Sequence, residues 1–241
     1  MTADRRRIVA CGGGGFVSTP DSPLIDYILG LAGRPRPRVC FVPTADGDAL
    51  PYVAMFYRAC AARDCEPSDL PLFNRTGEDL RAKLLAQDVI WVGGGNTANL
   101  LAIWRTHGVD EAMRDAWEAG IVLCGSSAGM ICWFEASITD SFGPQLDPLD
   151  DGLGFLPGSA CPHYDGEERR RPVYRAAVAN GFPAGYAADN DVGLRFDGTE
   201  LGECVSAREG ALGWRVELDG DQVAERPLPT RVLRAAGTPD A

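Results

Sequence analysis

The sequence Ile121-Val-Leu-Cys-Gly-Ser-Ser-Ala-Gly-Met-Ile-Cys-Trp-Phe134 decides the fold. It begins with an apolar run of β type at residues 121–124, turns through Gly125-Ser-Ser-Ala-Gly129, and continues as an apolar segment long enough for a helix. G-x-S-x-G between a strand and a helix is the context of a nucleophile elbow, where small neighbours allow a sharp turn that exposes the serine hydroxyl. The first N–H groups of the following helix would stabilise negative charge beside that hydroxyl. Ser127 is therefore the candidate nucleophile; the alternative is a tight turn that needs small residues for packing alone.

Strand and helix patterns alternate on both sides of this stretch. We expect strands at residues 8–10, 39–42, 70–73, 89–92 and 121–124, and helices at 24–31, 51–62, 80–86, 99–104, 110–119 and 172–180. The helix at 51–62 should bury one stripe made of Tyr52, Met55, Phe56 and Ala59. Alternating strands and helices predict an α/β fold with a mostly parallel sheet and helices on both faces.

The chain of 241 residues is long enough for a real core and fits one α/β domain over residues 1–241. Residues 185–196 have the pattern of a strand interrupted by a polar triplet, Asp189-Asn190-Asp191. From residue 201 onward the pattern changes to short strands and turns, which predicts a C-terminal β-hairpin tail over 201–241.

Charge and composition limit the classes of partner. The formal net charge of -11 argues against nucleic acid and anionic membranes. The N-terminus lacks the apolar region of a signal peptide, and no run is long enough to span a bilayer, so we expect a cytoplasmic protein. The 8 cysteines have no disulfide or metal-binding spacing, so we expect reduced thiols, no metal and no cofactor. A homodimer is the default expectation for the oligomeric state.

Two glycine-rich stretches follow predicted strands. Gly12-Gly-Gly-Gly15 resembles the start of a dinucleotide fingerprint, but Val17 stands where the third glycine of that fingerprint is required. The simpler interpretation is a flexible loop at the carboxyl end of a strand, where open α/β sheets place their sites. Gly93-Gly-Gly-Asn-Thr97 comes directly before a helix, so its bare N–H groups could bind an anion or oxyanion. A glycine turn needed only for close packing is the alternative.

A serine nucleophile needs a base, and the sequence contains 2 histidines. His107 lies at the predicted end of a helix, where histidine can simply interact with the last carbonyl groups. His163 lies in an irregular Pro-His-Tyr-Asp loop after a strand, from which a base can reach a nucleophile on a neighbouring strand. We therefore favour His163 as the base.

The third catalytic group should orient the imidazole. The candidates are Asp140, Asp165 and the triplet Asp189-Asn190-Asp191. Asp140 would give the chain order Ser, Asp, His, whereas the triplet would place the acid after His163. Spacing alone leaves this choice open.

Four motifs in register resemble the peptidase E (aspartyl dipeptidase) family, which is related to cyanophycinase and has a fold like that of class I glutamine amidotransferases. They are Gly93-Gly-Gly-Asn-Thr97, Gly125-Ser-Ser-Ala-Gly129, Cys161-Pro-His-Tyr-Asp165 and the Ala188-Asp-Asn-Asp-Val-Gly-Leu194 strand. The resemblance runs from about residue 8 to past residue 201. It implies a serine-type peptidase that acts on small peptides, Asp-X dipeptides in particular. It also implies Ser127 as the nucleophile, His163 as the base, and the backbone of Ala128 with that of Gly94 or Gly95 as the oxyanion hole.

The chain departs from that family at the third triad position, where the family has Glu, or Asp in some branches, and this chain has Asn190. An asparagine can accept the imidazole N–H but offers no full negative charge to the imidazolium, so we expect weakened catalysis. A one-residue shift would instead bring Asp189 or Asp191 to the imidazole. An altered triad could also leave a family member without Asp-X activity that binds or processes another small peptide or amino-acid ligand.

Substrate contacts are predicted from the charge of the substrate. The two carboxylates of an aspartyl dipeptide call for arginine donors, and Arg169, Arg170, Arg171 and Arg175 follow His163 closely. Arg171 and Arg175, with Asn96 and Asp140, are the candidates for substrate binding. A solvated, charged loop is the alternative for the arginine run.

Overall fold

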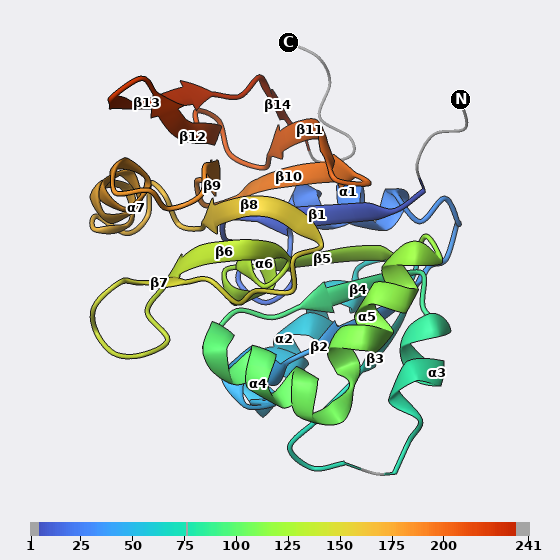
Figure 1. The fold of residues 1–241 in the computed structure, drawn as a ribbon. Helices are drawn as coiled ribbons and strands as arrows, with labels where there is room; N and C mark the ends of the chain where they lie inside the picture. Colours follow the sequence, from blue (N-terminus) through green and yellow to red (C-terminus); the bar gives the residue numbers. More distant parts are fainter. Residues whose placement is uncertain (1–4, 76, 235–241) are drawn as a thin grey trace.

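Two β-sheets form the centre of the computed structural model, which describes residues 5–75 and 77–234 (Figure 1). Residues 1–4 and 235–241 of the predicted 1–241 domain, and with them the end of the predicted 201–241 tail, lie outside the described residues, as does residue 76. Within the described ranges, no helix has the length and apolar character needed to cross a bilayer.

The larger sheet has eight strands. They are β1 (Arg7–Cys11), β2 (Arg38–Val42), β3 (Glu66–Asp69), β4 (Val89–Val92), β5 (Val122–Ser126), β10 (Val192–Asp197), β11 (Glu200–Ser206) and β14 (Thr230–Val232). Their order across the sheet is β14-β11-β10-β1-β5-β4-β2-β3. The five strands from β1 to β3 in this order are parallel, whereas β10 runs antiparallel to β1.

The smaller sheet has six strands. They are β6 (Phe134–Thr139), β7 (Asp147–Leu149), β8 (Leu156–Cys161), β9 (Gly185–Ala188), β12 (Gly213–Asp219) and β13 (Gln222–Pro227), in the order β13-β12-β9-β8-β6-β7. Its central strands β6, β8 and β9 are parallel. This second sheet cannot be recognised in the sequence, because strand patterns alone do not show which strands pair.

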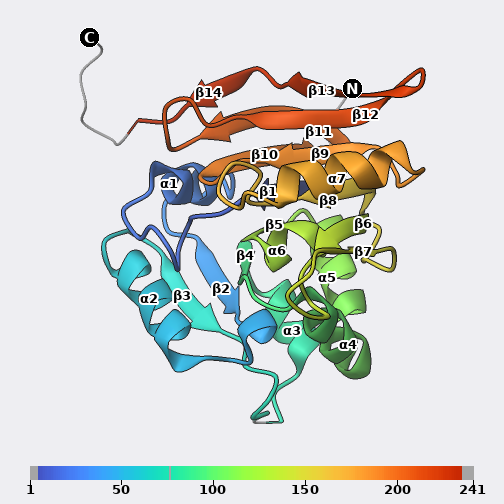
Figure 2. The ribbon, with the colours of Figure 1, turned by 90° about the vertical axis from the view of Figure 1, so that its left-hand side faces the viewer.

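Seven α-helices connect the strands of the described chain. They are α1 (Pro23–Gly30), α2 (Leu50–Ala61), α3 (Leu80–Leu85), α4 (Thr97–His107), α5 (Val109–Glu118), α6 (Ala128–Ile131) and α7 (Arg170–Ala179). Three of them begin at side-chain caps of the expected type: Ser22, Asp79 and Asn96 each accept a hydrogen bond from an N–H of the first turn. In Figure 2, α1 and α2 lie on one side of the larger sheet, and α3, α4 and α5 lie on the other.

The alternation of side chains along β1 explains this layering. Val9 and Cys11 belong to the hydrophobic cluster that contains the buried residues of α1 and α2, whereas Ile8 and Ala10 belong to the cluster of α4 and α5. Successive side chains of a strand point to opposite faces, so a central strand buried on both faces is apolar throughout. The predicted α/β class, with mostly parallel strands and helices on both faces, is confirmed.

Two details of the predicted elements were wrong. Residues 70–73 are not a strand; the strand beside β2 is β3, and the Asp48 carboxylate accepts hydrogen bonds from the N–H groups of Leu72 and Phe73 instead. A carboxylate that accepts both N–H groups removes them from any strand ladder. The apolar segment after Ser127 forms only the four-residue α6 before the chain enters β6.

The buried stripe of α2 also differs from the prediction. Tyr52 and Met55 are 44% and 36% exposed, whereas Phe56, Ala59 and Cys60 are buried against the sheet. The buried face of the helix therefore includes Cys60 in place of Tyr52 and Met55, and its first two turns present apolar side chains to solvent.

The C-terminal region is more than a hairpin. β12 and β13 form the expected antiparallel pair around residues 219–222. However, β11 pairs with β10 in the larger sheet, and β14 then pairs parallel with β11. Both views place β12, β13 and β14 together at one end of the molecule, beyond β9, β10 and β11 (Figures 1 and 2). This C-terminal region thus contributes strands to both sheets.

Candidate active site

Three loops of small residues leave adjacent parallel strands at the same edge of the larger sheet. The turn after β1 begins at Gly12, the elbow after β5 contains Ser127, and the loop after β4 begins at Gly93. β5 lies between β1 and β4. The carboxyl edge of a parallel sheet is where open α/β folds place their sites, and Ser127 is at the centre of that edge.

Ser127 occupies a strained backbone conformation, with φ of 57° and ψ of -113°. Sterics explain why the residues around Ser127 are small. A Cβ on Gly125 would lie 2.5 Å from the carbonyl oxygen of Val92, and a Cβ on Gly129 would lie 2.2 Å from the same oxygen. Strain of this kind is a feature of nucleophile elbows. Among the described residues, none makes a hydrogen bond with the Ser127 hydroxyl.

The glycine-rich turn after β1 supports the site through its carbonyl groups. The carbonyl of Cys11 accepts a hydrogen bond from Ser127 N–H at 3.2 Å, and the next carbonyl, of Gly12, accepts one from His163 N–H at 3.0 Å. The third carbonyl, of Gly13, accepts one from Asp191 N–H at 3.3 Å. Consecutive peptide groups of one turn therefore hold the serine, the histidine and the end of the polar triplet.

His163 contacts Asn190. Nδ1 of the imidazole lies 2.7 Å from Oδ1 of Asn190. Both residues are half-buried, and His163 has a positive φ of 52°. An amide oxygen can only accept, so this contact is a hydrogen bond in the tautomer whose proton is on Nδ1, which leaves the lone pair on Nε2.

The Asn190 side chain fills a narrow slot between two glycines. A Cβ on Gly13 would lie 2.1 Å from Oδ1 of Asn190, and a Cβ on Gly166 would lie 2.1 Å from Nδ2. The same Cβ on Gly13 would be 3.1 Å from Nδ1 of His163. Any side chain at either glycine would therefore displace the amide that contacts the imidazole.

The other candidate acids have different partners. Asp189 is buried, and its carboxylate accepts from Leu212 N–H and Trp214 Nε1–H. Burial raises the pKa of Asp189, although the Leu212 hydrogen bond opposes that shift. Asp191 lies 3.6 Å from Nε of Arg208. The Asp165 carboxylate accepts from Asn190 N–H at 2.8 Å. Of the triplet, the structure therefore brings Asn190 to His163.

Gly94 lies directly beside the serine. A Cβ on Gly94 would be 3.2 Å from Cβ and 3.8 Å from Oγ of Ser127. Gly93 and Asn96 donate their N–H groups to Val42 and Ala45, but within residues 5–75 and 77–234 the N–H groups of Gly94 and Gly95 have no acceptor. Ala128 opens the first turn of α6, where N–H groups lack intrahelical acceptors. The N–H groups at these positions can therefore donate hydrogen bonds to an added ligand oxygen.

Comparison with known proteins identifies the family. The model of peptidase family S51 matches residues 8–204. The chain belongs to peptidase family S51. It is 49% identical over 230 residues to the uncharacterized peptidase YgaJ of Bacillus subtilis (strain 168), which covers 95% of this chain and 99% of that protein. It is also 33% identical over 129 residues to peptidase E of Streptomyces coelicolor, with 53% of this chain and 51% of the relative covered.

A solved structure supports the fold assignment. The crystal structure of a peptidase from an acI-B1 actinobacterium superposes with a TM-score of 0.69 at 16% identity, covering 93% of this chain and 94% of that one. At this identity the likeness concerns the fold. The match of residues 8–204 to family S51 confirms the resemblance seen in the four sequence motifs at the level of the family.

In this S51 peptidase, the arginines predicted to bind a substrate are engaged within the protein. Arg171 and Arg175 both pair with Glu225, and the guanidinium of Arg171 lies 4.6 Å from the centre of the Trp214 ring. Arg169 donates to the carbonyl of Pro144, and the buried Arg170 pairs with Glu167. Each guanidinium thus has a partner before any substrate binds.

The two remaining candidates for substrate binding meet at one loop. The side chain of Asn96 caps α4 by accepting from Asn99 N–H, and its amide group donates to the carbonyl of Ser141 at 2.9 Å. Asp140, next to Ser141, is 55% exposed and lies 3.7 Å from the Arg170 guanidinium. Asn96 therefore joins the loop after β4 to the loop after β6, and Asp140 is open to solvent.

The other histidine, His107, and the two cysteines that could act as a nucleophile in place of Ser127, Cys124 and Cys161, are poorly placed for catalysis. His107 is the last residue of α4 and contacts Arg75. The eleven-residue helix is about 16 Å long, and it begins at the edge of the sheet that carries Ser127, so His107 lies at its far end. Cys124 and Cys161 are fully buried, and burial raises the pKa of Cys161 to about 12 and that of Cys124 well above the usual value. Buried, protonated thiols are unreactive.

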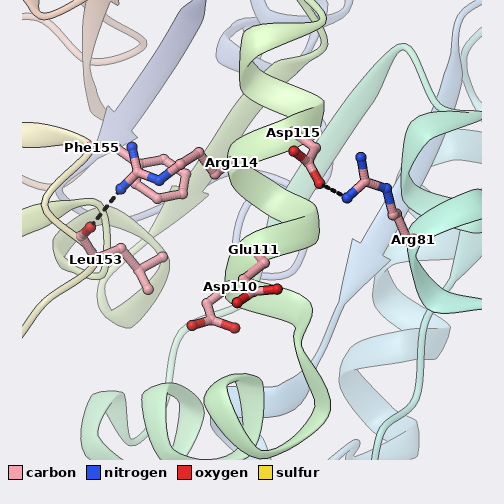
Figure 3. Close-up of a pocket in the computed structure, with 7 residues that line it drawn as sticks. All are labelled: Arg81, Asp110, Glu111, Arg114, Asp115, Leu153 and Phe155. Carbon is pink, nitrogen blue, oxygen red and sulfur yellow. Dashed lines mark hydrogen bonds and ion pairs between the residues drawn. The ribbon is translucent and has the colours of Figure 1, made fainter.

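A separate pocket of about 340 Å³ opens beside α5 (Figure 3). Figure 3 shows Arg81 paired with Asp115, and Arg114 donating to the carbonyl of Leu153. The distance from Arg114 Nη2 to the carbonyl oxygen of Leu153 is 3.1 Å. None of its lining residues comes from the loops that carry Ser127, His163 or Asn190. Throughout the described part of the chain, this pocket included, no three His, Cys, Asp or Glu side chains are grouped in a way that could hold a metal ion.

Three residues that contact the site's loops were missed by the sequence analysis: Arg208, Trp214 and Glu225. They lie in short β-strands and turns with no recognisable motif. Arg208 follows β11, which pairs with β10, whereas Trp214 and Glu225 reach the site because β12 pairs with β9 and with β13. A single sequence contains no signal that would have identified them.

Proposed function

We propose that this S51 peptidase is a serine-type hydrolase that cleaves small peptides with Ser127, His163 and Asn190. The observation that carries the proposal is the 2.7 Å contact of His163 Nδ1 with Asn190 Oδ1, on a loop anchored beside the strained Ser127. This contact keeps Nε2 as the base. A serine, a histidine and an orienting acceptor form the unit required for nucleophilic amide cleavage.

In the proposed mechanism, Oγ of Ser127 attacks the amide carbonyl carbon while Nε2 of His163 takes its proton. The carbonyl oxygen becomes an oxyanion, and the N–H groups of Ala128 and of Gly94 or Gly95 stabilise it. His163 then gives the proton to the leaving amine, which leaves an acyl-enzyme. Water, activated by the same imidazole, releases the acid and restores the serine.

Asn190 makes this triad weaker than one with a carboxylate. Its Oδ1 holds the imidazole in the correct tautomer, but a neutral amide gives little electrostatic stabilisation to the imidazolium that forms during attack. The nearby carboxylates of Asp189 and Asp191 are directed to Trp214 and Arg208 instead. We therefore expect slow turnover with an intact reaction path.

Asp-X dipeptides are the first substrates to test, because of the resemblance to peptidase E. A second candidate class is neutral dipeptides, and one observation favours it. Arg171 and Arg175, which would be the donors for substrate carboxylates, both pair with the buried Glu225. A family member that binds a small ligand without cleaving it is the remaining alternative.

The test is hydrolysis of a dipeptide panel that includes Asp-Leu, Asp-Ala, Ala-Leu and Leu-Ala by wild type and Ser127→Ala. Cleavage of any member by wild type but not by Ser127→Ala supports the serine mechanism, and the preferred member identifies the substrate class. Equal cleavage by both proteins would refute Ser127 as the nucleophile. A panel with no cleavage, combined with saturable binding of a peptide, would favour the non-catalytic alternative.

A further inference from the structure

Residues 208–225 contact both loops that carry the His163–Asn190 pair. The match to the S51 model ends at residue 204, so this C-terminal segment lies beyond the matched residues. It includes β12 and the first half of β13, and β12 pairs with β9, the strand that leads into Asn190. The contacts fall into three groups, each next to a residue of the proposed triad.

The first group holds the backbone of Asn190 on both sides. Oδ1 of Asp165 accepts a hydrogen bond from Asn190 N–H at 2.8 Å, and Nη2 of Arg208 donates to the carbonyl of Asn190 at 3.2 Å. The same Arg208 guanidinium pairs with the other carboxylate oxygen of Asp165. Asp165 and Arg208 thus form a closed ring of hydrogen bonds around the peptide groups of Asn190.

The second group holds the preceding residue, Asp189. Its two carboxylate oxygens accept from Leu212 N–H at 2.9 Å and from Trp214 Nε1–H at 3.2 Å, and its own N–H donates to the carbonyl of Leu212 at 3.1 Å. Asp189 is only 7% exposed. A buried carboxylate with these partners fixes the chain one residue before Asn190.

The third group reaches the histidine loop. The hydroxyl of Tyr164, the residue after His163, donates to Glu225 on β13. The Glu225 side chain is only 6% exposed and also pairs with Arg171 and Arg175 of α7. Burial raises the pKa of Glu225, but the hydrogen bonds from Tyr164, Arg171 and Arg175 outweigh burial and lower it overall. Glu225 is therefore a charged junction between β13, α7 and the loop of His163.

We propose that residues 208–225 are a positioning element for the triad, and that Arg208, together with Asp165, holds Asn190 against His163. The inference rests on the proposed role of the Ser127–His163–Asn190 triad. A neutral amide attracts the imidazole less strongly than a carboxylate does. The placement of Asn190 therefore depends on the surrounding protein: the slot between Gly13 and Gly166 confines its side chain, and the ring of Asp165 and Arg208 fixes its backbone.

The test compares Arg208→Gln and Asp165→Ala with a matched control, Arg226→Gln. Arg226 lies on β13 in the β12–β13 hairpin, and its ion pairs with Glu217 and Asp219 stay within that hairpin. We expect kcat for the cleaved dipeptide to fall about 10-fold in Arg208→Gln and Asp165→Ala with little change in KM, since small displacements of catalytic groups are costly. Arg208→Lys should recover part of the loss, and Arg226→Gln should match wild type.

A double-mutant cycle separates positioning from a general loss of structure. In an Asn190→Ala background, Arg208→Gln should lower kcat less than 2-fold, because the group that it positions is gone. A full 10-fold loss in that background would overturn the proposal. Hydrolysis that is insensitive to Ser127→Ala would instead refute the proposed triad itself, so the two failures are distinguishable.

A second readout needs no turnover. The chain has 2 histidines, so ¹⁵N-labelled imidazole spectra of a His107→Gln protein report His163 alone. Wild type should show one tautomer with a proton on Nδ1, and Arg208→Gln should shift the spectrum toward a mixture with faster exchange of that proton. An unchanged His163 spectrum in both Arg208→Gln and Asp165→Ala would contradict the positioning role.

Discussion

Replacing Asn190 with aspartate should increase the activity of this S51 peptidase. The aspartate has the same shape as the asparagine and fits the slot between Gly13 and Gly166. It would keep the acceptor that now lies 2.7 Å from Nδ1 of His163 and add a negative charge. The charge matters only when the imidazole is protonated, which occurs during the reaction, so the gain should appear in kcat.

The size of the effect follows from the geometry. Two charges about 4 Å apart attract by about 4 kcal/mol at an effective dielectric constant of about 20. Part of this is lost to desolvation and to repulsion from Asp165 and Asp191, which leaves about 1.4 to 2.8 kcal/mol, or about 10- to 100-fold in kcat. The reverse substitution in serine proteases costs about 10⁴, but there the wrong tautomer contributes. In this protein Oδ1 of Asn190 already selects the correct tautomer.

The assay is steady-state hydrolysis of the best dipeptide by wild type, Asn190→Asp and Asn190→Glu, with the melting temperature measured for each. Asn190→Glu is the matched control: it adds the same charge, but its extra methylene must fit a slot where a glycine Cβ would lie 2.1 Å from the amide. We expect Asn190→Asp to gain more than Asn190→Glu. A folded Asn190→Asp protein with unchanged or lower kcat would refute the reasoning.

Three further predictions follow from the packing of the site. Gly13→Ala should lower kcat about 100-fold by displacing Asn190, whereas Gly30→Ala, which has open space around its Cβ, should not; equal kcat in both would contradict this. Iodoacetamide should leave the native enzyme active, because Cys124 and Cys161 are buried and protonated; peptide mapping should find these thiols modified only after unfolding. The partners of Glu225 lower its pKa below the ordinary value of 4.5. The ionised Glu225 therefore stabilises the folded state fully well above that pH, and this stabilisation is lost as the pH falls. The difference in melting temperature between wild type and Glu225→Gln should therefore shrink on acidification, and a difference independent of pH would be inconsistent with this pairing.

The fold class and the sharp turn at Ser127 could be predicted from the sequence, because both depend on local patterns. An apolar run followed by G-x-S-x-G is sufficient to place a strand and a sharp turn, and the structure gives the serine the expected strained backbone. The glycines beside Ser127 suggest close packing of the backbone, and the structure shows it: Gly129 closely approaches the carbonyl of Val92. Local rules of this kind do not require knowledge of which strands pair.

The identity of the third group could not be predicted, because it depends on pairing between distant strands. Residues 185–196 form two strands in different sheets, β9 and β10, and the polar triplet is the crossing between them. The path of the chain from β9 to β10 determines that Asn190 contacts His163 and that Asp189 contacts Trp214. Arg208 reaches the site through the pairing of β11 with β10, and Glu225 reaches it through the pairing of β12 with β9 and β13. Neither pairing leaves a local signature in the sequence.

Covalent labelling of Ser127 tests the central claim most directly. Wild type, Ser127→Ala and His163→Ala are treated with a fluorophosphonate, and the adduct is located by mass spectrometry of the peptides. An activated serine should give one adduct on the peptide that contains Ser127, none in Ser127→Ala and much slower labelling in His163→Ala. An adduct-free wild type, or equal labelling of wild type and His163→Ala, would contradict the proposed nucleophile and base.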